Sequence, residues 1–422
     1  MTFENSLAFA RSLDAVDTLK QFRSRFYIPK LNGKEVIYLT GNSLGLQPKT
    51  ARERIETELK DWENLGVEGH LQGKNPWLYY HHFTEESLAR IVGAKKEEVV
   101  AMNTLSVNLH LLMVSFYRPN GKRKKIVMEA NAFPSDQYAI ETQVRFHNLN
   151  PEDCIIEVAP KDGEHILRTE DILKVIDANK DEIALILFGG VNYLSGQLFN
   201  LKAITEAAHN AGAMVGFDLA HAAGNAVLKL HDWNTDFACW CSYKYLNSGP
   251  GGVGGIFVHE KHSANAGLPR FAGWWGNDER TRFEMKKGFF PQPGAAGWQL
   301  SNAQIFPMAI HRASLDIFDE AGIENLRVKS IKLTAYLEFI ITDYNQKHTG
   351  KRLQIISPKT AEDRGCQLSL IAEQNGKEIF EQLTKAGVVA DWREPNVIRM
   401  APVPLYNSFE EVFQLGQILN SL

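Results

Sequence analysis

Between residues 85 and 260, short apolar runs alternate with amphipathic stretches, and this alternation constrains the fold more than any other feature of the chain. The apolar runs include EEVVAM, KKIVME, CIIEVA, IALILF, AMVGFD, FACWC and GGIFVH, which have the length and composition of buried strands. The segment LKAITEAAHNAG has helical spacing and ends at Gly212. Together they predict an α/β fold with a mostly parallel sheet, helices on both faces, and ligands at the carboxyl ends of the strands.

The length of the chain predicts more than one domain, because 422 residues exceed what one hydrophobic core usually organises. We expect an N-terminal arm over residues 1–50, which ends in TGNSLGLQPK and feeds the ligand site. A large domain is expected over residues 51–304 and a smaller C-terminal α/β domain over residues 305–422, against which the N-terminal segment can pack.

Composition excludes several classes of partner. The 46 basic residues are outnumbered by 50 acidic ones, so no basic face for nucleic acid is expected. The opening MTFENSLAFARSLDAVDTLK lacks the apolar core of a signal peptide, and no later run approaches the length of a bilayer span. A cytoplasmic protein without a nucleic-acid or membrane partner is therefore expected.

The four cysteines, Cys154, Cys239, Cys241 and Cys366, are too few for a disulfide framework. Cys239 and Cys241 are separated by one residue, and no second Cys/His pair has zinc spacing. The cysteine pattern therefore predicts no metal site.

Lys244 lies in CWCSYKYLNSGPGG, just after an apolar run and before five glycines within the seven residues 249–255. A lysine amine becomes a useful nucleophile when desolvation or a nearby cation lowers its pKa, and a strand end inside a cleft can supply both. For any single lysine, a surface position in a turn is the ordinary alternative. A second motif favours the reactive interpretation.

That second motif is AMVGFDLAHAAGN, in which Asp218 directly follows an apolar run and His221 stands three residues later. A carboxylate buried at a strand end costs free energy unless it is paired, and a protonated pyridine nitrogen is a suitable partner. Taken alone, Asp218 could equally be a helix cap or part of a buried ion pair instead of a cofactor contact. His221 alone could be a hydrogen-bonded core residue. With Lys244 placed 26 residues after Asp218, the two motifs indicate a pyridoxal 5'-phosphate (PLP) site.

Two further segments offer contacts for such a cofactor. In AMNTLSVNLHLL, Ser106 stands at the mouth of a predicted helix, where free backbone N–H groups favour a phosphate, although a plain helix cap is the alternative. In EANAFPSDQYAI, Phe133 offers a flat ring and Asp136 an anion beside it. Phe133 taken alone fits a core position better.

Six segments together resemble the kynureninase family of fold-type I, aspartate-aminotransferase-like PLP enzymes, nearly end to end. They are TGNSLGLQPK, FPSDQYA, VGFDLAHAAGN, DFACWCSYKYLNSGPGG, FAGWWG and RMAPVPLYNSF. The resemblance implies a PLP-dependent hydrolase that acts as a homodimer with shared active sites. Its reaction would cleave the Cβ–Cγ bond of L-kynurenine or 3-hydroxy-L-kynurenine, releasing anthranilate or 3-hydroxyanthranilate and L-alanine, in tryptophan degradation and NAD biosynthesis.

The resemblance also implies which residues hold the cofactor. Lys244 would be the Schiff-base lysine, Asp218 the partner of the pyridinium nitrogen, and Phe133 the ring stacked on the cofactor. Further contacts would come from Leu105, Ser106, Pro134, Ser135, Asp136, His221 and Tyr243, with Trp274 and Asn302 reaching across from the second subunit. Tyr243 would be catalytic as a proton relay, and a simple phosphate contact fits it equally well.

Substrate contacts follow from the same resemblance. Arg399, in NVIRMAPVP, matches the arginine that clamps the substrate α-carboxylate, a role suited to its planar fork of donors. Ser43, His70, Ser301 and Asn302 would contact the rest of the substrate. The last three resemble the forms of the family that favour the 3-hydroxylated substrate.

One position departs from the family pattern. Where kynureninases often carry a hydroxyl residue after the strand IALILF, this chain has Gly189 in FGGVNY. The glycine removes any polar contact that a side chain would make there.

A cysteine desulfurase-like lyase is a rival, because it shares the fold and the Asp and Lys chemistry. It needs a nucleophilic cysteine on a mobile loop, whereas Cys154, Cys239 and Cys241 are predicted on strands and Cys366 in a strand-like run. The cysteines therefore favour the hydrolase.

A second rival is a PLP-fold protein without catalytic activity. Its mark would be the loss of Lys244, Asp218 or Arg399. All three are present in this chain.

Overall fold

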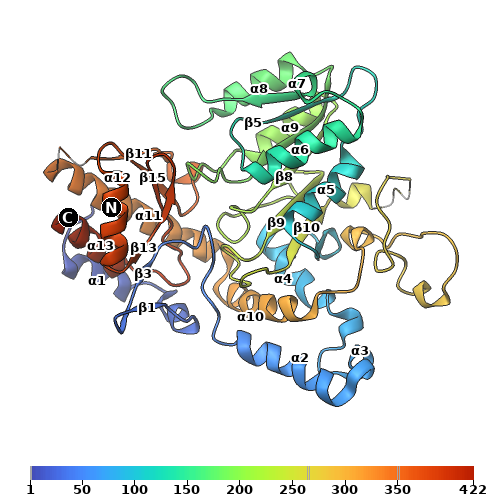
Figure 1. The fold of residues 1–422 in the computed structure, drawn as a ribbon, viewed down its shortest axis with the longest axis horizontal. Coiled ribbons are helices and arrows are strands. Elements are labelled where there is room, and N and C mark those ends of the chain that lie inside the picture. The colour runs from blue at the N-terminus through green and yellow to red at the C-terminus, as the bar shows by residue number, and fades with distance from the viewer. Residues whose placement is uncertain (1, 264, 266, 349, 351) are drawn as a thin grey trace.

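The computed structural model describes residues 2–422 except 264, 266, 349 and 351. Figure 1 shows a large lobe built on one twisted sheet and a smaller lobe that holds both chain termini. The large sheet has seven strands in the order β4-β10-β9-β8-β7-β5-β6. Because β10 pairs antiparallel with both β9 and β4, the other six strands run in one direction. The predicted α/β fold with a mostly parallel sheet is confirmed.

The strands of the large sheet coincide with the predicted apolar runs. They are β4 (Val99–Ala101), β5 (Lys125–Glu129), β6 (Ile155–Val158), β7 (Ile183–Gly189), β8 (Met214–Asp218), β9 (Phe237–Cys241) and β10 (Gly254–Val258). Along β7, Leu185 and Leu187 belong to the core on one face, whereas Ile186 and Phe188 belong to the core on the other. Burial on both faces explains why these strands have continuous apolar runs instead of alternating ones.

Helices cover both faces of this sheet. One face carries α5 (Leu105–Phe116) and α6 (Pro134–Phe146), and the other carries α8 (Thr169–Ala178) and α9 (Leu201–Asn210). The helix predicted to end at Gly212 is α9, which stops at Asn210, and Gly212 has a positive φ of 69° that ends the turn.

Two details of the sequence prediction were wrong. The run CIIEVA was expected to be a buried strand, but Ile155 and Ile156 are half-buried and Glu157 is exposed, because β6 is the edge strand and has a single neighbour. Cys154 ends the short helix α7 (Pro151–Cys154) instead of lying on a strand, and Cys366 precedes β12. All four cysteines are nevertheless buried with free thiols.

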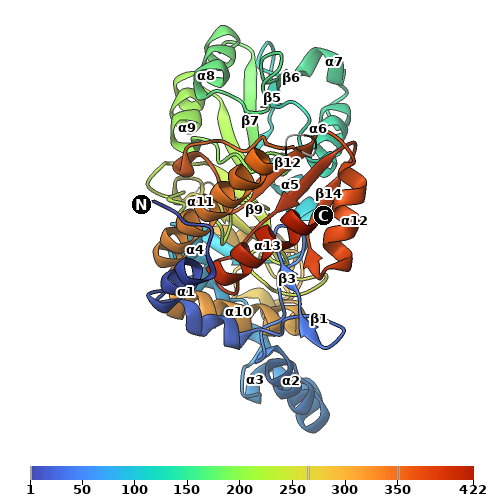
Figure 2. The same cartoon turned by 90° about the vertical axis from the view of Figure 1, so that its left-hand side faces the viewer.

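The small lobe contains an antiparallel sheet in the order β11-β12-β15-β14. Its strands are β11 (Leu353–Ile355), β12 (Leu368–Ala372), β14 (Asp391–Arg393) and β15 (Val397–Met400), and its helices are α11 (Ile323–Lys347), α12 (Gly376–Lys385) and α13 (Phe409–Ser421). Figure 2 shows α11, α12 and α13 on the side of the molecule that holds both termini.

The N-terminal segment packs on the small lobe. Ala10 and Leu13 of α1 (Leu7–Ala15) belong to the same apolar core as Leu415 of α13. Further along, β3 (Ile37–Tyr38) pairs in parallel with β13 (Val388–Val389). Ala10, Leu13, Ile37 and Leu39 therefore share one core with the small lobe. The residues between them, Leu19, Phe22 and Phe26, belong to the core of the large lobe instead.

The junction between the lobes bears on the domain boundaries. Helix α10 (Ile305–Ala321) contributes Met308, Leu315 and Phe318 to the core of the large lobe and packs against α2 (Ala51–Leu65) and α4 (His82–Val92). The division into domains remains a proposal, and this packing favours a boundary near Gly322 over one at residue 305.

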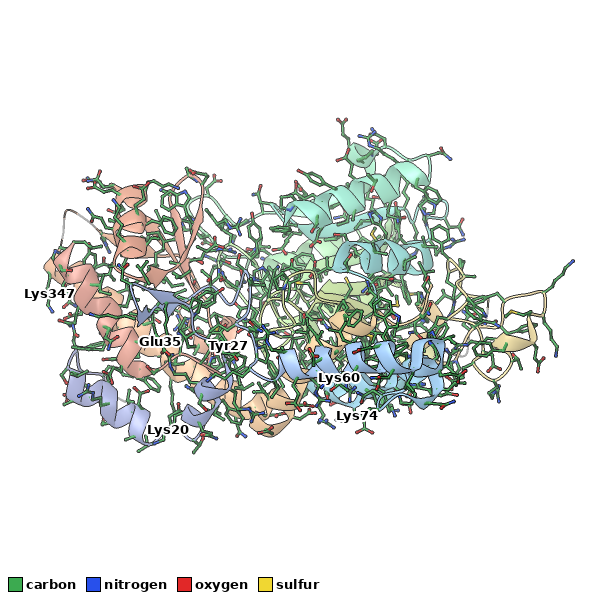
Figure 3. All side chains as sticks on the ribbon, turned by 60° about the horizontal axis from the view of Figure 1, so that its bottom comes forward. Lys20, Tyr27, Glu35, Lys60, Lys74 and Lys347 are labelled. Atoms are coloured by element: carbon green, nitrogen blue, oxygen red, sulfur yellow. The ribbon has the colours of Figure 1, made fainter. Side chains whose placement is uncertain are left out.

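The remaining elements are short: β1 (Lys30–Leu31), β2 (Lys34–Glu35) and α3 (Gly69–Gln72), together with several 3-10 turns. The lysines labelled in Figure 3 lie on both lobes, with Lys20 and Lys347 on the small one, Lys60 on α2 and Lys74 just after α3. None of the described helices combines the length and the apolar character that crossing a lipid bilayer requires.

Candidate active site

A cavity of about 220 Å³ opens at the carboxyl ends of β5, β7, β8 and β9, where the fold predicts a ligand. Its lining includes these residues named from the sequence: Leu105, Ser106, Phe133, Ser135, Asp136, Asp218, His221, Tyr243 and Lys244. Strand ends and the first turns of α5 and α6 supply them, so residues up to 139 positions apart in sequence meet around one space.

Lys244 follows β9 and extends into this cavity. Its Nζ lies 3.0 Å from Nε2 of His221 and 5.7 Å from the ring centre of Phe133. Burial and the Lys244 cation lower the pKa of His221 well below its usual value. A neutral His221 can therefore accept a hydrogen bond from the lysine amine, which orients that amine in the cavity.

Two buried carboxyl groups stand opposite this lysine. Asp218 ends β8 and accepts a hydrogen bond from the backbone N–H of Ala220 at 2.7 Å. Asp136 comes from the first turn of α6 and contacts Asp218. Burial raises the pKa of both groups, and the charge of Asp218 raises the pKa of Asp136 further, so the pair can share one proton.

A third carboxyl group, that of Glu129 at the end of β5, lines the same cavity. It accepts hydrogen bonds from the Gly189 N–H at 3.2 Å and from Nδ2 of Asn192 at 2.7 Å. Burial raises the pKa of Glu129 to about 7, with a contribution from Asp218. Glu129 was not named from the sequence, although its place at the end of an apolar strand is the signal that identified Asp218.

The contact with Glu129 accounts for Gly189. A Cβ atom at position 189 would lie 2.7 Å from Oε1 of Glu129, closer than two such atoms can approach. The polar contact at this position comes from the glycine backbone. A hydroxyl residue here would require the Glu129 carboxyl to move.

The cavity fits PLP at its ring end. Three carboxyl groups, Glu129, Asp136 and Asp218, face one lysine and one neutral histidine, so a cationic ring nitrogen would supply charge that the cavity lacks. Phe133 is 39% exposed, unusual for a ring beside a buried site, and therefore has a face free to stack. Nδ1 of His221 is buried without a hydrogen-bond partner.

The cavity also fits PLP at its phosphate end. Helix α5 begins at the cavity, and the side chain of its first flanking residue, Thr104, makes no capping hydrogen bond. The N–H groups of Leu105 and Ser106 remain available in the first turn, where the helix dipole favours an anion.

Tyr193 is a second lining residue that the sequence did not reveal. Its ring meets that of Phe133 edge to face, with centroids 5.3 Å apart. Its backbone carbonyl accepts a hydrogen bond from Nη1 of Arg399 at 2.6 Å. Tyr193 therefore joins the cofactor cavity to the arginine, yet it lies in a loop without any pattern that would single it out.

Arg399 is 1% exposed on β15 and contacts the cavity lining through its hydrogen bond to Tyr193. Its Nη2 pairs with Oδ2 of Asp391 at 2.6 Å, and the same oxygen accepts a hydrogen bond from Ser43 at 3.0 Å. Nε of Arg399 is buried without a partner. Ser43 and Arg399, both named as substrate contacts, are thus brought together through Asp391, which orients the guanidinium.

The other named residues lie elsewhere on the chain. His70, Trp274 and Asn302 line a second cavity of about 570 Å³, separate from the one that holds Lys244. Ser301 is exposed next to Asn302. Pro134 is exposed at the start of α6 and does not line the first cavity. One chain therefore carries two separate parts of the predicted site.

The cysteines lack the setting that a desulfurase requires. Burial raises the pKa of all four thiols, including that of Cys366 to about 12. A buried thiol with a raised pKa is a poor nucleophile.

Comparison with known proteins identifies the family. The model described as aminotransferase class-V matches residues 37–360, and that of the kynureninase C-terminal domain matches residues 326–419. A kynureninase of Flavobacterium psychrophilum is 56% identical over 419 residues, covering 99% of this chain and 98% of that protein. A kynureninase of Myxococcus xanthus is 54% identical over 418 residues, with 99% and 97% covered.

Solved structures are similar in fold. A cysteine desulfurase from Thermococcus onnurineus superposes with a TM-score of 0.75 at 17% identity, covering 92% of this chain and 94% of that one. At this identity the likeness shows the fold alone, whereas the kynureninase relatives match both lobes. The chain belongs to the kynureninases, PLP-dependent enzymes of the aminotransferase class-V family.

Proposed function

We propose that the cavity at the strand ends binds PLP and that the enzyme hydrolyses kynurenines there to an anthranilate and L-alanine. The observation that carries the proposal is the meeting of Lys244, Asp218 and Phe133 in one cavity that also receives the start of α5. PLP, when bound, stabilises negative charge that develops at the substrate Cα.

The residues of the chain have distinct roles in this proposal. Lys244 holds the cofactor and takes the α-proton on Nζ, with His221 orienting that atom from 3.0 Å. Asp218 holds a proton on the ring nitrogen. Water adds to the substrate ketone, and Tyr243, which lines the same cavity, exchanges protons with the groups that form and break there. The pKa of Tyr243 is raised by burial, so its hydroxyl stays protonated and can donate.

A homodimer would complete the site. The second cavity holds the residues expected to act across a subunit interface, and large apolar side chains around it are exposed: Val67, Leu71, Tyr79, Trp274 and Phe283. In Figure 1 the segment that follows β10, at the yellow-orange part of the scale, extends away from the sheet. Such a surface is typical of a contact with a second copy. The four free thiols favour a cytoplasmic location.

The proposal is tested by substrate turnover. Purified protein with PLP is expected to release L-alanine from both kynurenines, with a kcat/KM about five- to thirtyfold higher for 3-hydroxykynurenine. The reason is that His70 and Asn302, once covered by the partner subunit, would present polar groups that are left unpaired when the phenolic hydroxyl is absent, which costs about 1–2 kcal/mol. Product formation is measured side by side by chromatography.

His70→Trp combined with Asn302→Thr is expected to narrow or reverse this preference. Equal kcat/KM values in the unmodified enzyme would disprove the preference and leave the hydrolysis intact. Failure to release alanine from either compound would disprove the proposed function.

Arg399→Ala is expected to lower kcat/KM at least about tenfold, because a charge-assisted pair with the substrate carboxylate contributes about 1.5–3 kcal/mol. Arg393→Ala is the matched control, since Arg393 also pairs with Asp391 but its side chain is 37% exposed. Steady-state kinetics of the two variants should therefore differ. An unchanged kcat/KM in Arg399→Ala would place the carboxylate elsewhere.

A further inference from the structure

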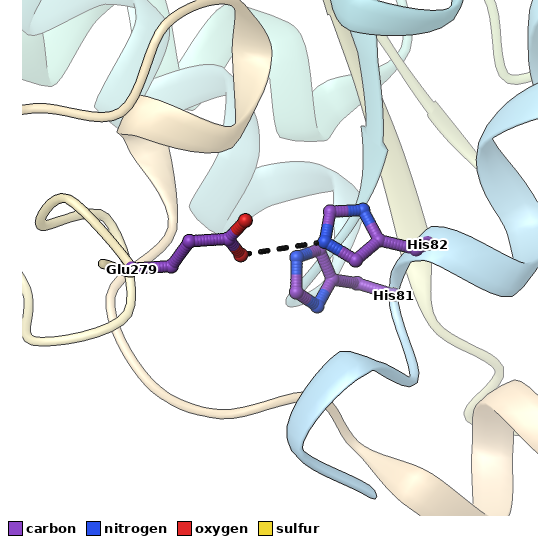
Figure 4. A group of neighbouring side chains, drawn as sticks. All are labelled: His81, His82 and Glu279. Atoms are coloured by element: carbon purple, nitrogen blue, oxygen red, sulfur yellow. Dashed lines mark hydrogen bonds and ion pairs between the residues drawn. The ribbon is translucent and has the colours of Figure 1, made fainter. Parts of the chain in front are cut away.

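A group of three potential metal ligands lies outside the PLP cavity. His81 directly precedes α4, His82 begins it, and Glu279 comes from the segment between β10 and α10 (Figure 4). One nitrogen or oxygen atom from each lies within 4.8 Å of the other two. Figure 4 shows a ring nitrogen of His81 facing the Glu279 carboxylate, beside the ring of His82.

His81 supplies an independent observation. The residue is fully buried, and neither of its ring nitrogens has a hydrogen-bond partner. A ring nitrogen without a hydrogen-bond partner can offer its lone pair to a metal ion. An imidazole buried without any polar partner costs free energy, and a bound cation would remove that cost.

His82 is oriented as metal-bound histidines usually are. Its Nδ1 lies 2.8 Å from Oε1 of Glu85, whose side chain is 8% exposed, while its Nε2 points to Glu279. A carboxylate that accepts the Nδ1 proton leaves Nε2 with its lone pair, the arrangement that outer carboxylates create around zinc.

The distance between two of the ligand atoms agrees with coordination. Nε2 of His82 and Oε2 of Glu279 are 3.4 Å apart, long for a charge-assisted hydrogen bond. Two ligands at about 2.0–2.1 Å from one tetrahedral zinc ion are separated by roughly 3.3 Å.

We propose that His81, His82 and Glu279 bind one Zn²⁺ ion. Two imidazoles and one carboxylate are zinc ligands, and three protein ligands leave a fourth position for water. Because Glu279 also lines the second cavity, the ion joins α4 to the segment that carries Trp274. Zinc then stabilises the part of the chain expected to reach the partner's active site.

The charged groups around the three ligands are compatible with a bound cation. Without a metal, a protonated His82 could pair with both Glu85 and Glu279. That arrangement would still leave both ring nitrogens of His81 without a hydrogen-bond partner. Arg282 lies near His81 and carries a positive charge, and Lys96 is 3.8 Å from Glu85. The backbone carbonyls of Trp275 and Asn277 hold the Arg282 guanidinium, and the carboxylates of Glu85 and Glu279 offset the two cations.

A second group, Glu98, His231 and His259, provides a matched control. Its ligand atoms meet the same distance limit. Here, however, His231 pairs with Glu98 at 2.9 Å, and Nδ1 of His259 accepts the N–H of Lys261 at 3.2 Å. Neither ring has an unpartnered buried nitrogen, so this group is expected to bind no zinc.

The experiment measures bound metal directly. Tag-free holoenzyme is stripped with a chelator, titrated with ZnCl₂, desalted and analysed for zinc and protein. We expect one zinc per chain, retained in His231→Gln. His82→Gln and Glu279→Gln each remove a ligand and should weaken binding at least about a hundredfold, whereas Glu85→Gln, which removes the outer carboxylate, should weaken it by roughly 10- to 100-fold.

The outcomes separate the possibilities. Glu279 is exposed, so Glu279→Gln should fold normally. Zinc should raise the melting temperature of the unmodified protein but not that of this variant. Absence of stoichiometric zinc in the unmodified protein would overturn the proposal. So would zinc that is retained in both ligand variants, or lost in His231→Gln alone. None of these readouts depends on turnover.

Discussion

Lys244→Ala is expected to lower kcat by at least about 10²- to 10⁴-fold, the contribution of a positioned general base. The loss should be larger than this range if the lysine also anchors the cofactor covalently. The physical reason is the place of Nζ, which is within 3.0 Å of His221 and above the Phe133 ring, where no other lysine lines the cavity among the described residues. Turnover of the purified variant is compared with that of the unmodified enzyme.

A chemical experiment tests the anchor independently. Borohydride reduction of the PLP-loaded enzyme, followed by peptide mapping, should place a pyridoxyl group on Lys244. Lys347→Ala is a suitable control, because Lys347 lies on α11 at the surface of the small lobe, where it pairs with Asp343 (Figure 3). A pyridoxyl group found on another lysine would end the catalytic assignment.

Asp218→Asn is expected to lower kcat by about 10²- to 10³-fold while bound PLP falls far less. This range is typical for the loss of one pre-organised electrostatic contact at a reacting group. A neutral amide cannot sustain a positive charge on the ring nitrogen, whereas the contacts at the start of α5 remain. The measurement compares kcat with cofactor content at saturating PLP.

Asp136→Asn is the matched control for this variant. Burial and the neighbouring Asp218 raise the pKa of Asp136, so replacing Asp136 by an amide is expected to change the charge of the cavity less than replacing Asp218 does. Its kcat should fall much less than that of Asp218→Asn. Near-normal turnover in Asp218→Asn would disprove the proposed role of Asp218 at the ring nitrogen. Equal losses of kcat in the two variants would show that Asp218 and Asp136 supply the negative charge together.

The sequence alone determined the architecture of the large lobe and the core of the site. Seven apolar runs of strand length, separated by helical stretches, are sufficient to predict a mostly parallel sheet, because the hydrophobic pattern is local and the burial of both sheet faces follows from it. Asp218 and Lys244 could also be predicted as site residues from the sequence. Each follows an apolar run of strand length, and parallel strands bring their carboxyl ends to one edge of the sheet.

Other features were decided by packing. The sequence did not show that α10 belongs to the core of the large lobe, because an amphipathic helix does not specify which surface its apolar face will cover. It also placed Cys154 on a strand, since one turn of helix before β6 has too few residues for a periodic signal.

The detailed chemistry of the site depends on tertiary structure for the same reason. Glu129 and Gly189 are 60 residues apart, and His82 and Glu279 are 197 apart. Contacts at such separations arise only when whole elements dock, and a sequence pattern carries information about a few turns or one strand at a time. The sequence therefore determined which residues stand at strand ends, and the tertiary structure alone decided which carboxyl groups meet, how Arg399 is held, and why one chain presents its site in two parts.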